Sequence, residues 1–187
     1  KFYDKSLEKL YHHCRVAAIE ALELKEDSIV VDLACGTGQK FPHIMSKLGE
    51  KGVLVGLDYS AGMLQAAQAK IDKNGWENVH LLEKDARELC LEDISTIPDK
   101  VPTHILCVLG FSVIPDWQMV LDNMFGILAP GGTLVIVDVH AEKRTFHTWL
   151  VERIARADVS RQPWLHLKKR GMDYDLQYLP GKERTYG

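Results

Sequence analysis

The sequence has little that would mark a disulfide-bonded, metal-binding or membrane protein. Its four cysteines, Cys14, Cys35, Cys90 and Cys107, form no Cys-x-x-Cys pair, and the eight histidines form no spaced ligand set with them. No apolar run approaches the ~20 residues that a membrane-spanning helix needs. The net charge of -3 comes without a dense basic stretch, which argues against a nucleic-acid groove. We therefore expect reduced thiols, no structural metal, no transmembrane segment and no nucleic-acid partner, in a cytoplasmic protein.

Length and composition fit one domain. The chain has 187 residues, 46% of them apolar, which is enough to bury a sizeable core. It contains no internal repeat and no low-complexity linker, and strand signals alternate with helix signals along its length. Such alternation is typical of βαβ units. We expect a single domain over residues 1–187 with an α/β fold and a doubly wound, mostly parallel sheet.

Hydrophobic periodicity and turn residues give the element boundaries. The expected strands cover residues 28–33, 52–57, 79–83, 103–109 and 133–139, and the expected helices cover residues 4–23, 40–48, 60–74, 116–128 and 145–156. A shorter mixed segment covers residues 86–97. Ser60 is placed to cap the helix that follows it, and Gly75 is placed to end that helix.

The most informative stretch covers residues 29–38, which read IVVDLACGTG. An apolar strand there runs into a loop of small residues, where glycines let backbone approach a ligand. Open α/β sheets bind ligands beyond the carboxyl ends of their strands. At those ends the loop amides can hold an anionic group, Asp58 can accept both hydroxyls of a ribose, and Asp85 with the Ala86 amide suits an adenine edge. This pattern predicts a nucleotide-type cofactor site.

A dinucleotide site is the main alternative, because its Gly-x-Gly-x-x-Gly fingerprint also precedes an acidic residue about 20 positions later. Counting from Gly36, bulky Phe41 stands where the third glycine should allow a helix to pack closely on a strand. Asp32 would also repel a pyrophosphate. A carboxylate at that position favours a ligand that carries a cation, such as an α-ammonium group.

Four motifs occur in order: VDLACGTG at residues 31–38, VGLDYSAGML at 55–64, EKDA at 83–86 and LAPGG at 128–132. Together they resemble the class I S-adenosylmethionine-dependent methyltransferases over residues 28–140. The resemblance implies a Rossmann-like fold that binds S-adenosylmethionine and releases S-adenosylhomocysteine. It also implies that residues 1–24 form a leading helix or lid, residues 25–140 form the cofactor-binding core, and residues 141–187 form a substrate-side helix and the start of a terminal hairpin.

The resemblance assigns roles residue by residue. The methionine moiety would be held by Asp32 and by the loop Ala34, Cys35, Gly36, Thr37 and Gly38; the ribose by Asp58; the adenine faces by Tyr59 and Met63; and the adenine edge by Asp85 and Ala86. Leu109, which ends the fourth strand, is also assigned to the cofactor site. Ala34 replaces the glycine commonly found at its position, so the loop is expected to be slightly stiffer.

The acceptor is expected to be a small or lipid-like molecule. Residues 112–117 and 157–164 resemble parts of small-molecule and phospholipid N-methyltransferases, and residues 2–4 resemble quinone-pathway C-methyltransferases. Methyl transfer from a sulfonium by in-line displacement needs mainly positioning. If a proton must leave, His140 and the adjacent Asp138 are the candidate bases. Tyr3 is expected in a lid, and Phe111 with Trp117 in an aromatic wall for the acceptor.

Three functions stay open at this point: methyl transfer, NAD(P)-dependent oxidation and reduction on a Rossmann fold, and binding of S-adenosylmethionine without catalysis. The terminal hairpin is expected to be incomplete, because few residues follow the segment 174–179 and the turn at Pro180. We expect native residues beyond Gly187. An exposed sheet edge would then favour a homodimer. The sequence identifies neither the acceptor substrate nor its accepting atom.

Overall fold

The computed structural model describes residues 2–94, 101–141, 156–170 and 174–179, together with residues 145, 149, 152 and 153. Side chains are described from Tyr11 onward. The expected helix 145–156 lies for the most part outside the described residues, and so do the side chain of Tyr3 and residues 180–187.

A five-stranded parallel sheet forms the centre of the fold, in the order β3-β2-β1-β4-β5. The strands are β1 (Ile29–Leu33), β2 (Val53–Asp58), β3 (Val79–Glu83), β4 (His104–Val108) and β5 (Thr133–Val137). The order reverses between β1 and β4, which is where open α/β sheets form a ligand crevice. The expected doubly wound parallel sheet is confirmed.

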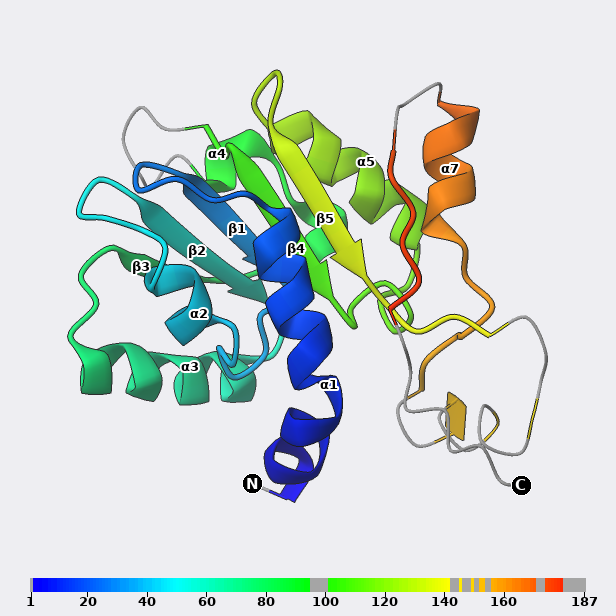
Figure 1. Ribbon diagram of the computed structural model, residues 1–187, viewed down its shortest axis with the longest axis horizontal. Coiled ribbons are helices and arrows are strands. Elements are labelled where there is room, and N and C mark those ends of the chain that lie inside the picture. Colours follow the sequence, from blue (N-terminus) through cyan, green and yellow to red (C-terminus); the bar gives the residue numbers. More distant parts are fainter. Residues whose placement is uncertain are drawn as a thin grey trace.

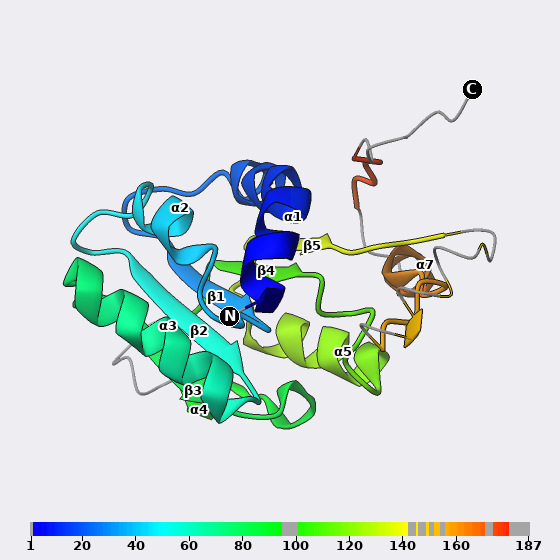
Figure 2. The same ribbon diagram turned by 90° about the horizontal axis from the view of Figure 1, so that it is seen from below.

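Helices cover both faces of the sheet (Figures 1 and 2). One face packs against α1 (Phe2–Ala21), α2 (Phe41–Met45) and α3 (Ala61–Asn74), and the other against η1 (Ala86–Glu88), α4 (Leu91–Ile94) and α5 (Trp117–Ile127). Two apolar clusters, one on each side, form the core. Strand β2 is buried along its whole length, whereas β5 at the sheet edge is half-buried throughout.

Several element boundaries differ from the sequence prediction. Helix α2 has five residues, and the segment 86–97 contains only η1 and α4 among the residues that the structure describes. Ser60 is the N-cap residue of α3, but its hydroxyl makes no capping hydrogen bond; Gly75 ends the helix with a left-handed φ of 64°. Residues 174–179, expected at the start of the terminal hairpin, have no regular structure.

The sequence prediction missed α7 (Pro163–Lys169). At seven residues the helix is too short for a clear apolar period, although proline in its first turn and basic residues in its last turn are typical helix signals. It lies beside α5 (Figure 1), where His166 Nε2 is 3.1 Å from Asp122 Oδ1 and Arg170 pairs with the same carboxylate.

Phe41 explains why two glycines occur where they do. Its side chain is fully buried, and an added Cβ on Gly38 would lie 2.7 Å from its ring. An added Cβ on Gly56 would lie 2.6 Å from Phe41 Cζ. The ring therefore fills the space that the missing side chains of a loop glycine and a strand glycine leave.

Replacing Gly56 with alanine is expected to lower the free energy of unfolding by about 1–3 kcal/mol, the usual cost of overpacking a core. Urea unfolding followed by circular dichroism measures the loss. Gly62→Ala is the matched control, because no heavy atom lies within 4 Å of its added Cβ. Phe41→Leu should recover part of the loss in a double variant, and equal losses at Gly56 and Gly62 would contradict the packing explanation.

Candidate functional site

Two non-glycine residues with a left-handed backbone mark the crevice between β1 and β4. Ala34 follows β1 with a φ of 55°, and Leu109 follows β4 with a φ of 60°. Such a conformation costs a residue with a Cβ about 1–2 kcal/mol, so a glycine would fit the Ala34 position with less strain. An added Cβ on Gly110 would lie 3.1 Å from Ala34 Cβ. The loops after β1 and β4 are therefore in contact, and the predicted site residues Ala34 and Leu109 lie at the same crevice.

Asp58 joins the end of β2 to the glycine loop. Its Oδ2 accepts a hydrogen bond of 2.9 Å from the Gly36 amide, and its Oδ1 accepts one of 3.0 Å from the Ser60 amide. The residue is only 8% exposed. Each carboxylate oxygen has two acceptor sites, so both oxygens can still accept a ligand hydroxyl. A Cβ on Gly36 would meet no heavy atom within 4 Å, so the loop faces open space beside this carboxylate.

Asp32 is a fully buried carboxylate with a counter-charge from its own chain. Lys40 Nζ lies 3.1 Å from Asp32 Oδ1 in an ion pair, and the lysine is itself buried. Among the described residues, none gives either Asp32 oxygen a hydrogen bond of good geometry. Burial raises the pKa of the Asp32 carboxyl to about 6, and the Lys40 ammonium opposes that rise. The sequence prediction missed Lys40, although a lysine that begins a buried helix was a signal for such a pair.

Of the residues predicted to contact adenine, two have exposed side chains and one already forms an ion pair. Tyr59 is 80% exposed and Met63 is 38% exposed, so both side chains are open to a ligand. The Asp85 carboxylate instead pairs with Arg87, whose Nη2 lies 2.6 Å from Asp85 Oδ2. Hydrogen bonds from the Arg87 side chain and amide hold the pKa of Asp85 below its usual value. Sequence reasoning missed this arginine, which also reaches Asp116 at 3.3 Å.

Asp138, which follows β5, is held by backbone amides. Its Oδ2 accepts a hydrogen bond of 2.8 Å from Ser112 N, and its Oδ1 accepts one of 2.8 Å from Val139 N. Burial raises the pKa of this carboxyl. His140 lies two residues further on, with its ring 4.9 Å from the Trp164 ring in an edge-to-face arrangement. Its Nδ1 is buried and has no hydrogen-bond partner among the residues that the structure describes.

Arg161 ties the segment before α7 to the loop that follows β4. Its Nη1 donates hydrogen bonds to the carbonyl oxygens of Phe111 and Ile114, and its Nε lies 3.3 Å from Asp158 Oδ2. The Asp158 amide donates a 2.7 Å hydrogen bond to Ser112 O. The two stretches 112–117 and 157–164, noted separately in the sequence, are therefore in direct contact.

Replacing Arg161 with glutamine is expected to lower the free energy of unfolding by about 1–3 kcal/mol, because two carbonyls lose a charged donor. Chemical denaturation measures this loss. Lys169→Gln, at an exposed position on α7, is the control and should stay within about 0.5 kcal/mol of the parent. An unchanged unfolding free energy for Arg161→Gln would show that the loop holds its shape without this clamp.

Comparisons with known proteins agree with this geometry. Residues 24–170 match the family described as "Methyltransferase domain". The chain belongs to this family. A demethylmenaquinone methyltransferase from Listeria welshimeri is 28% identical to the methyltransferase domain over 130 residues, which is 70% of this chain and 52% of that protein. The chain thus spans about half the length of this curated relative.

Solved structures share the fold of the methyltransferase domain. A SAM-dependent methyltransferase from Aquifex aeolicus has a TM-score of 0.65 and 23% identity, covering 90% of this chain and 83% of its own. Phosphoethanolamine N-methyltransferase 2 from Haemonchus contortus, in complex with S-adenosyl-L-methionine, has a TM-score of 0.69 and 17% identity, covering 85% and 36%. The fold is the class I, Rossmann-like methyltransferase fold.

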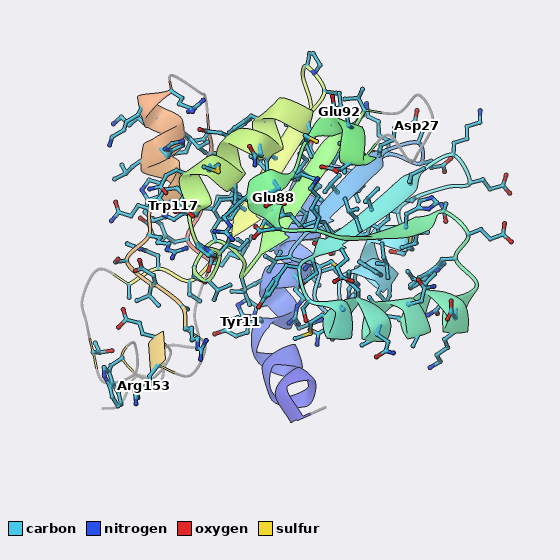
Figure 3. The ribbon with its side chains drawn as sticks, turned by 180° about the vertical axis from the view of Figure 1, so that it is seen from behind. Tyr11, Asp27, Glu88, Glu92, Trp117 and Arg153 are labelled. Atoms are coloured by element: carbon cyan, nitrogen blue, oxygen red, sulfur yellow. The ribbon has the colours of Figure 1, made fainter. Side chains whose placement is uncertain are left out.

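Burial excludes one of the two residues expected in an aromatic wall of the methyltransferase domain. Phe111 is fully buried and belongs to the core, so its predicted role is wrong. Trp117 is half-buried between the rings of Phe111 and His166, with centroid distances of 6.4 and 5.8 Å. Figure 3 places Tyr11 of α1 close to the edge where the strands end.

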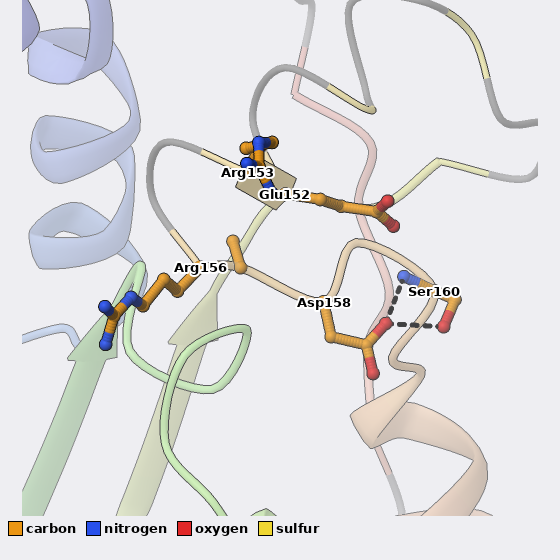
Figure 4. A pocket seen from close by; sticks show the side chains of 6 residues that line it. Glu152, Arg153, Arg156, Asp158 and Ser160 are labelled. Atoms are coloured by element: carbon orange, nitrogen blue, oxygen red, sulfur yellow. Dashed lines mark hydrogen bonds between the residues drawn. The ribbon is translucent and has the colours of Figure 1, made fainter.

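A hollow of about 570 Å³ lies beside the segment 156–160 of the methyltransferase domain (Figure 4). Its lining mixes both charges, because Arg153 and Arg156 are basic whereas Glu152 and Asp158 are acidic. Asp158 is turned toward Ser160, whose amide and hydroxyl both donate to Asp158 Oδ1. Nothing in this lining favours one class of ligand.

Three further observations concern the described part of the methyltransferase domain. It contains no helix long and apolar enough to cross a membrane. It contains no group of three metal-ligating side chains. All four cysteines are free thiols, and burial raises the pKa of Cys35 and Cys107.

Proposed function

We propose that this domain binds S-adenosylmethionine and directs its methyl group to a small, lipid-like acceptor. The observation that carries the proposal is the Asp58 carboxylate, which lies at the end of β2 and is hydrogen-bonded to the Gly36 amide of the glycine loop. This hydrogen bond fixes the proposed ribose acceptor relative to the loop that would hold the methionine end. The demethylmenaquinone methyltransferase relative supports a quinone-like ring as the acceptor class.

The residues present fit this cofactor. The loop Ala34, Cys35, Gly36, Thr37 and Gly38 would hold the methionine end together with Asp32, while Asp58 would hold the ribose. Exposed Tyr59 and Met63 would cover the adenine faces, with Ala86 at the adenine edge and Leu109 beside the crevice. Asp85 can join them only by sharing its carboxylate with Arg87. When bound, the sulfonium supplies an activated methyl group, so the protein needs mainly to align the acceptor.

The acceptor side is formed by the loops after β4 and β5. Arg161 and Asp138 fix the loop 110–116 from two directions, which keeps its backbone in one shape while an acceptor binds. Both Asp138 oxygens already accept amide hydrogen bonds, so this carboxylate positions the loop. His140 remains the candidate for accepting a proton, because its Nδ1 has no partner among the described residues.

Calorimetry and methyl transfer test the proposal together. We expect S-adenosylhomocysteine to bind the purified chain and NAD to show no binding. We also expect labelled methyl groups to pass from S-adenosylmethionine to a component of a metabolite extract or to a demethylated quinone. Binding of NAD alone would overturn the proposal in favour of an oxidoreductase. Binding of S-adenosylhomocysteine without transfer to any component would leave a cofactor-binding protein, the third function considered from the sequence.

A further inference from the structure

Two ion pairs of one arginine link the expected adenine edge to the loop that precedes α5. Arg87 lies in the middle of η1, with its Nη2 2.6 Å from Asp85 Oδ2 and its Nη1 3.3 Å from Asp116 Oδ2. Asp85 immediately precedes η1, and Asp116 immediately precedes α5. The guanidinium therefore bridges the segment after β3 and the loop after β4.

The Asp85 carboxylate keeps one acceptor site open after Arg87 has bound it. Its Oδ1 accepts hydrogen bonds from the Arg87 amide at 3.0 Å and from Arg87 Nε at 3.1 Å, and its Oδ2 accepts the bond from Nη2. A carboxylate has about four acceptor sites, so these three N–H groups leave one site for a ligand. The Asp85 side chain is 35% exposed, so a ligand can reach that site.

Asp116 is the N-cap residue of α5, but its carboxylate does not cap the helix. Its backbone is left-handed with a φ of 48°, and its side chain forms no capping hydrogen bond. An aspartate at this position normally accepts an amide of the first turn. Here the carboxylate contacts Arg87 instead. Backbone strain of this kind is concentrated at functional positions, where the surrounding structure maintains it.

Stability alone does not account for the bridge. The side chains of Arg87 and Asp116 are 40% and 63% exposed, and exposed ion pairs contribute little to stability. The backbone of η1 also has its own attachment to α5, because Asn123 Nδ2 donates hydrogen bonds to Ala86 O at 3.1 Å and to Arg87 O at 2.8 Å. The short helix is therefore held in place without the Arg87 side chain, whose contacts all serve to fix the two carboxylates.

We propose that Arg87, held by Asp116, is a positioning residue that orients the Asp85 carboxylate toward the amino group of adenine and thereby sets the selectivity for this base. The inference rests on the proposed function. An ionised carboxylate only accepts hydrogen bonds, and the adenine amino group donates them. Hypoxanthine has a carbonyl oxygen at the same position, so it presents an acceptor to an acceptor. A carboxylate that cannot turn away therefore rejects hypoxanthine more strongly than a mobile one.

Calorimetry with two ligands measures this selectivity. One is S-adenosylhomocysteine, and the other is S-inosylhomocysteine, in which a carbonyl group replaces the amino group of the base. We expect the parent chain to bind the adenosyl ligand about tenfold more tightly or better. Arg87→Gln should lower the ratio of the two affinities about fivefold, and Asp116→Asn should lower it about threefold. Asparagine tolerates the left-handed backbone at residue 116, so this variant removes the charge and keeps the turn.

Two further variants separate orientation from charge. Arg87→Lys keeps the positive charge but loses the planar fork of donors, so the selectivity should recover only in part. Glu88→Gln is the matched control, because Glu88 is an exposed neighbour on η1 whose side chain forms no ion pair with a described residue. Its ratio of affinities should equal that of the parent chain.

Thermal unfolding of each variant monitors the fold, and Asp116→Asn decides the matter if Arg87→Gln does not fold. An unchanged ratio of affinities in either variant, or equal binding of the two ligands by the parent chain, would overturn the inference. Failure of the parent chain to bind either ligand would instead overturn the proposed function.

Discussion

Replacing Asp58 with alanine is expected to weaken binding of S-adenosylhomocysteine by at least a hundredfold. The proposed contact gives a charged acceptor to two ribose hydroxyls, and hydrogen bonds to charged groups contribute about 1.5–3 kcal/mol each. Two such bonds correspond to about two to four powers of ten in the dissociation constant. Calorimetry at a fixed pH measures the change.

The Asp58 variant also removes an internal restraint. In the parent chain the carboxylate accepts the amides of Gly36 and Ser60, so alanine leaves both without their acceptor. The loss of binding should therefore come with a lower melting temperature, and binding is measured well below it. Glu83→Gln is the matched control, because Glu83 is the exposed register partner of Asp58 on β3. Binding within threefold of the parent in Asp58→Ala would remove Asp58 from the cofactor site.

Replacing Lys40 with methionine is expected to lower the free energy of unfolding at pH 7.5 by about 3–5 kcal/mol, since it leaves the buried Asp32 carboxylate without its counter-charge. Urea unfolding provides the measurement. Lys47→Met is the control, because Lys47 is an exposed lysine just after α2. A double variant, Lys40→Met with Asp32→Leu, should recover much of the loss. Equal losses in the single and double variants would show that packing of the lysine stem, and not its charge, is responsible.

The pair of Asp32 and Lys40 also predicts how the stability of the fold changes with pH. The pKa of Asp32 is about 6 in the fold, above its ordinary value of 3.8, so the folded state binds this proton more tightly than the unfolded state. The contribution of Asp32 to stability therefore falls as the pH rises from about 4 to about 6 and is constant above that range. Without Lys40 the pKa of Asp32 rises further, so the difference in the free energy of unfolding between variant and parent should increase from pH 5.5 to pH 7.5. A difference that is independent of pH would exclude this explanation.

The sequence alone was sufficient to predict the sheet and the position of the glycine loop. Buried strands and turn glycines are local features, and their order along the chain predicted the βαβ alternation. The position of Asp58 could be predicted because it ends a strand at the carboxyl edge of the sheet, where its environment depends little on distant segments. Asp32 was a different case. Its carboxylate was expected to face a ligand cation, and the structure places the Lys40 ammonium beside it.

Contacts between distant segments were beyond the sequence for a physical reason. Phe111 lies near the predicted acceptor loop, but whether an aromatic side chain there faces a ligand or the core depends on how α5 packs, and it is fully buried. The hydrogen bonds of Arg161 join residues about fifty positions apart, so no local sequence pattern could predict them. Helix α7 was missed because seven residues carry too little periodicity.

By itself, the sequence determined the parallel sheet, the glycine loop and the acidic residues that end its strands, because periodicity, turn chemistry and strand ends are properties of short segments. Only the tertiary structure decided which charges meet. Lys40 against Asp32, Arg87 against Asp116, and Arg161 against the carbonyls of Phe111 and Ile114 all depend on how elements cross in space. Burial then sets the strength of each pair, because a carboxylate removed from water needs a partner that the fold brings to it.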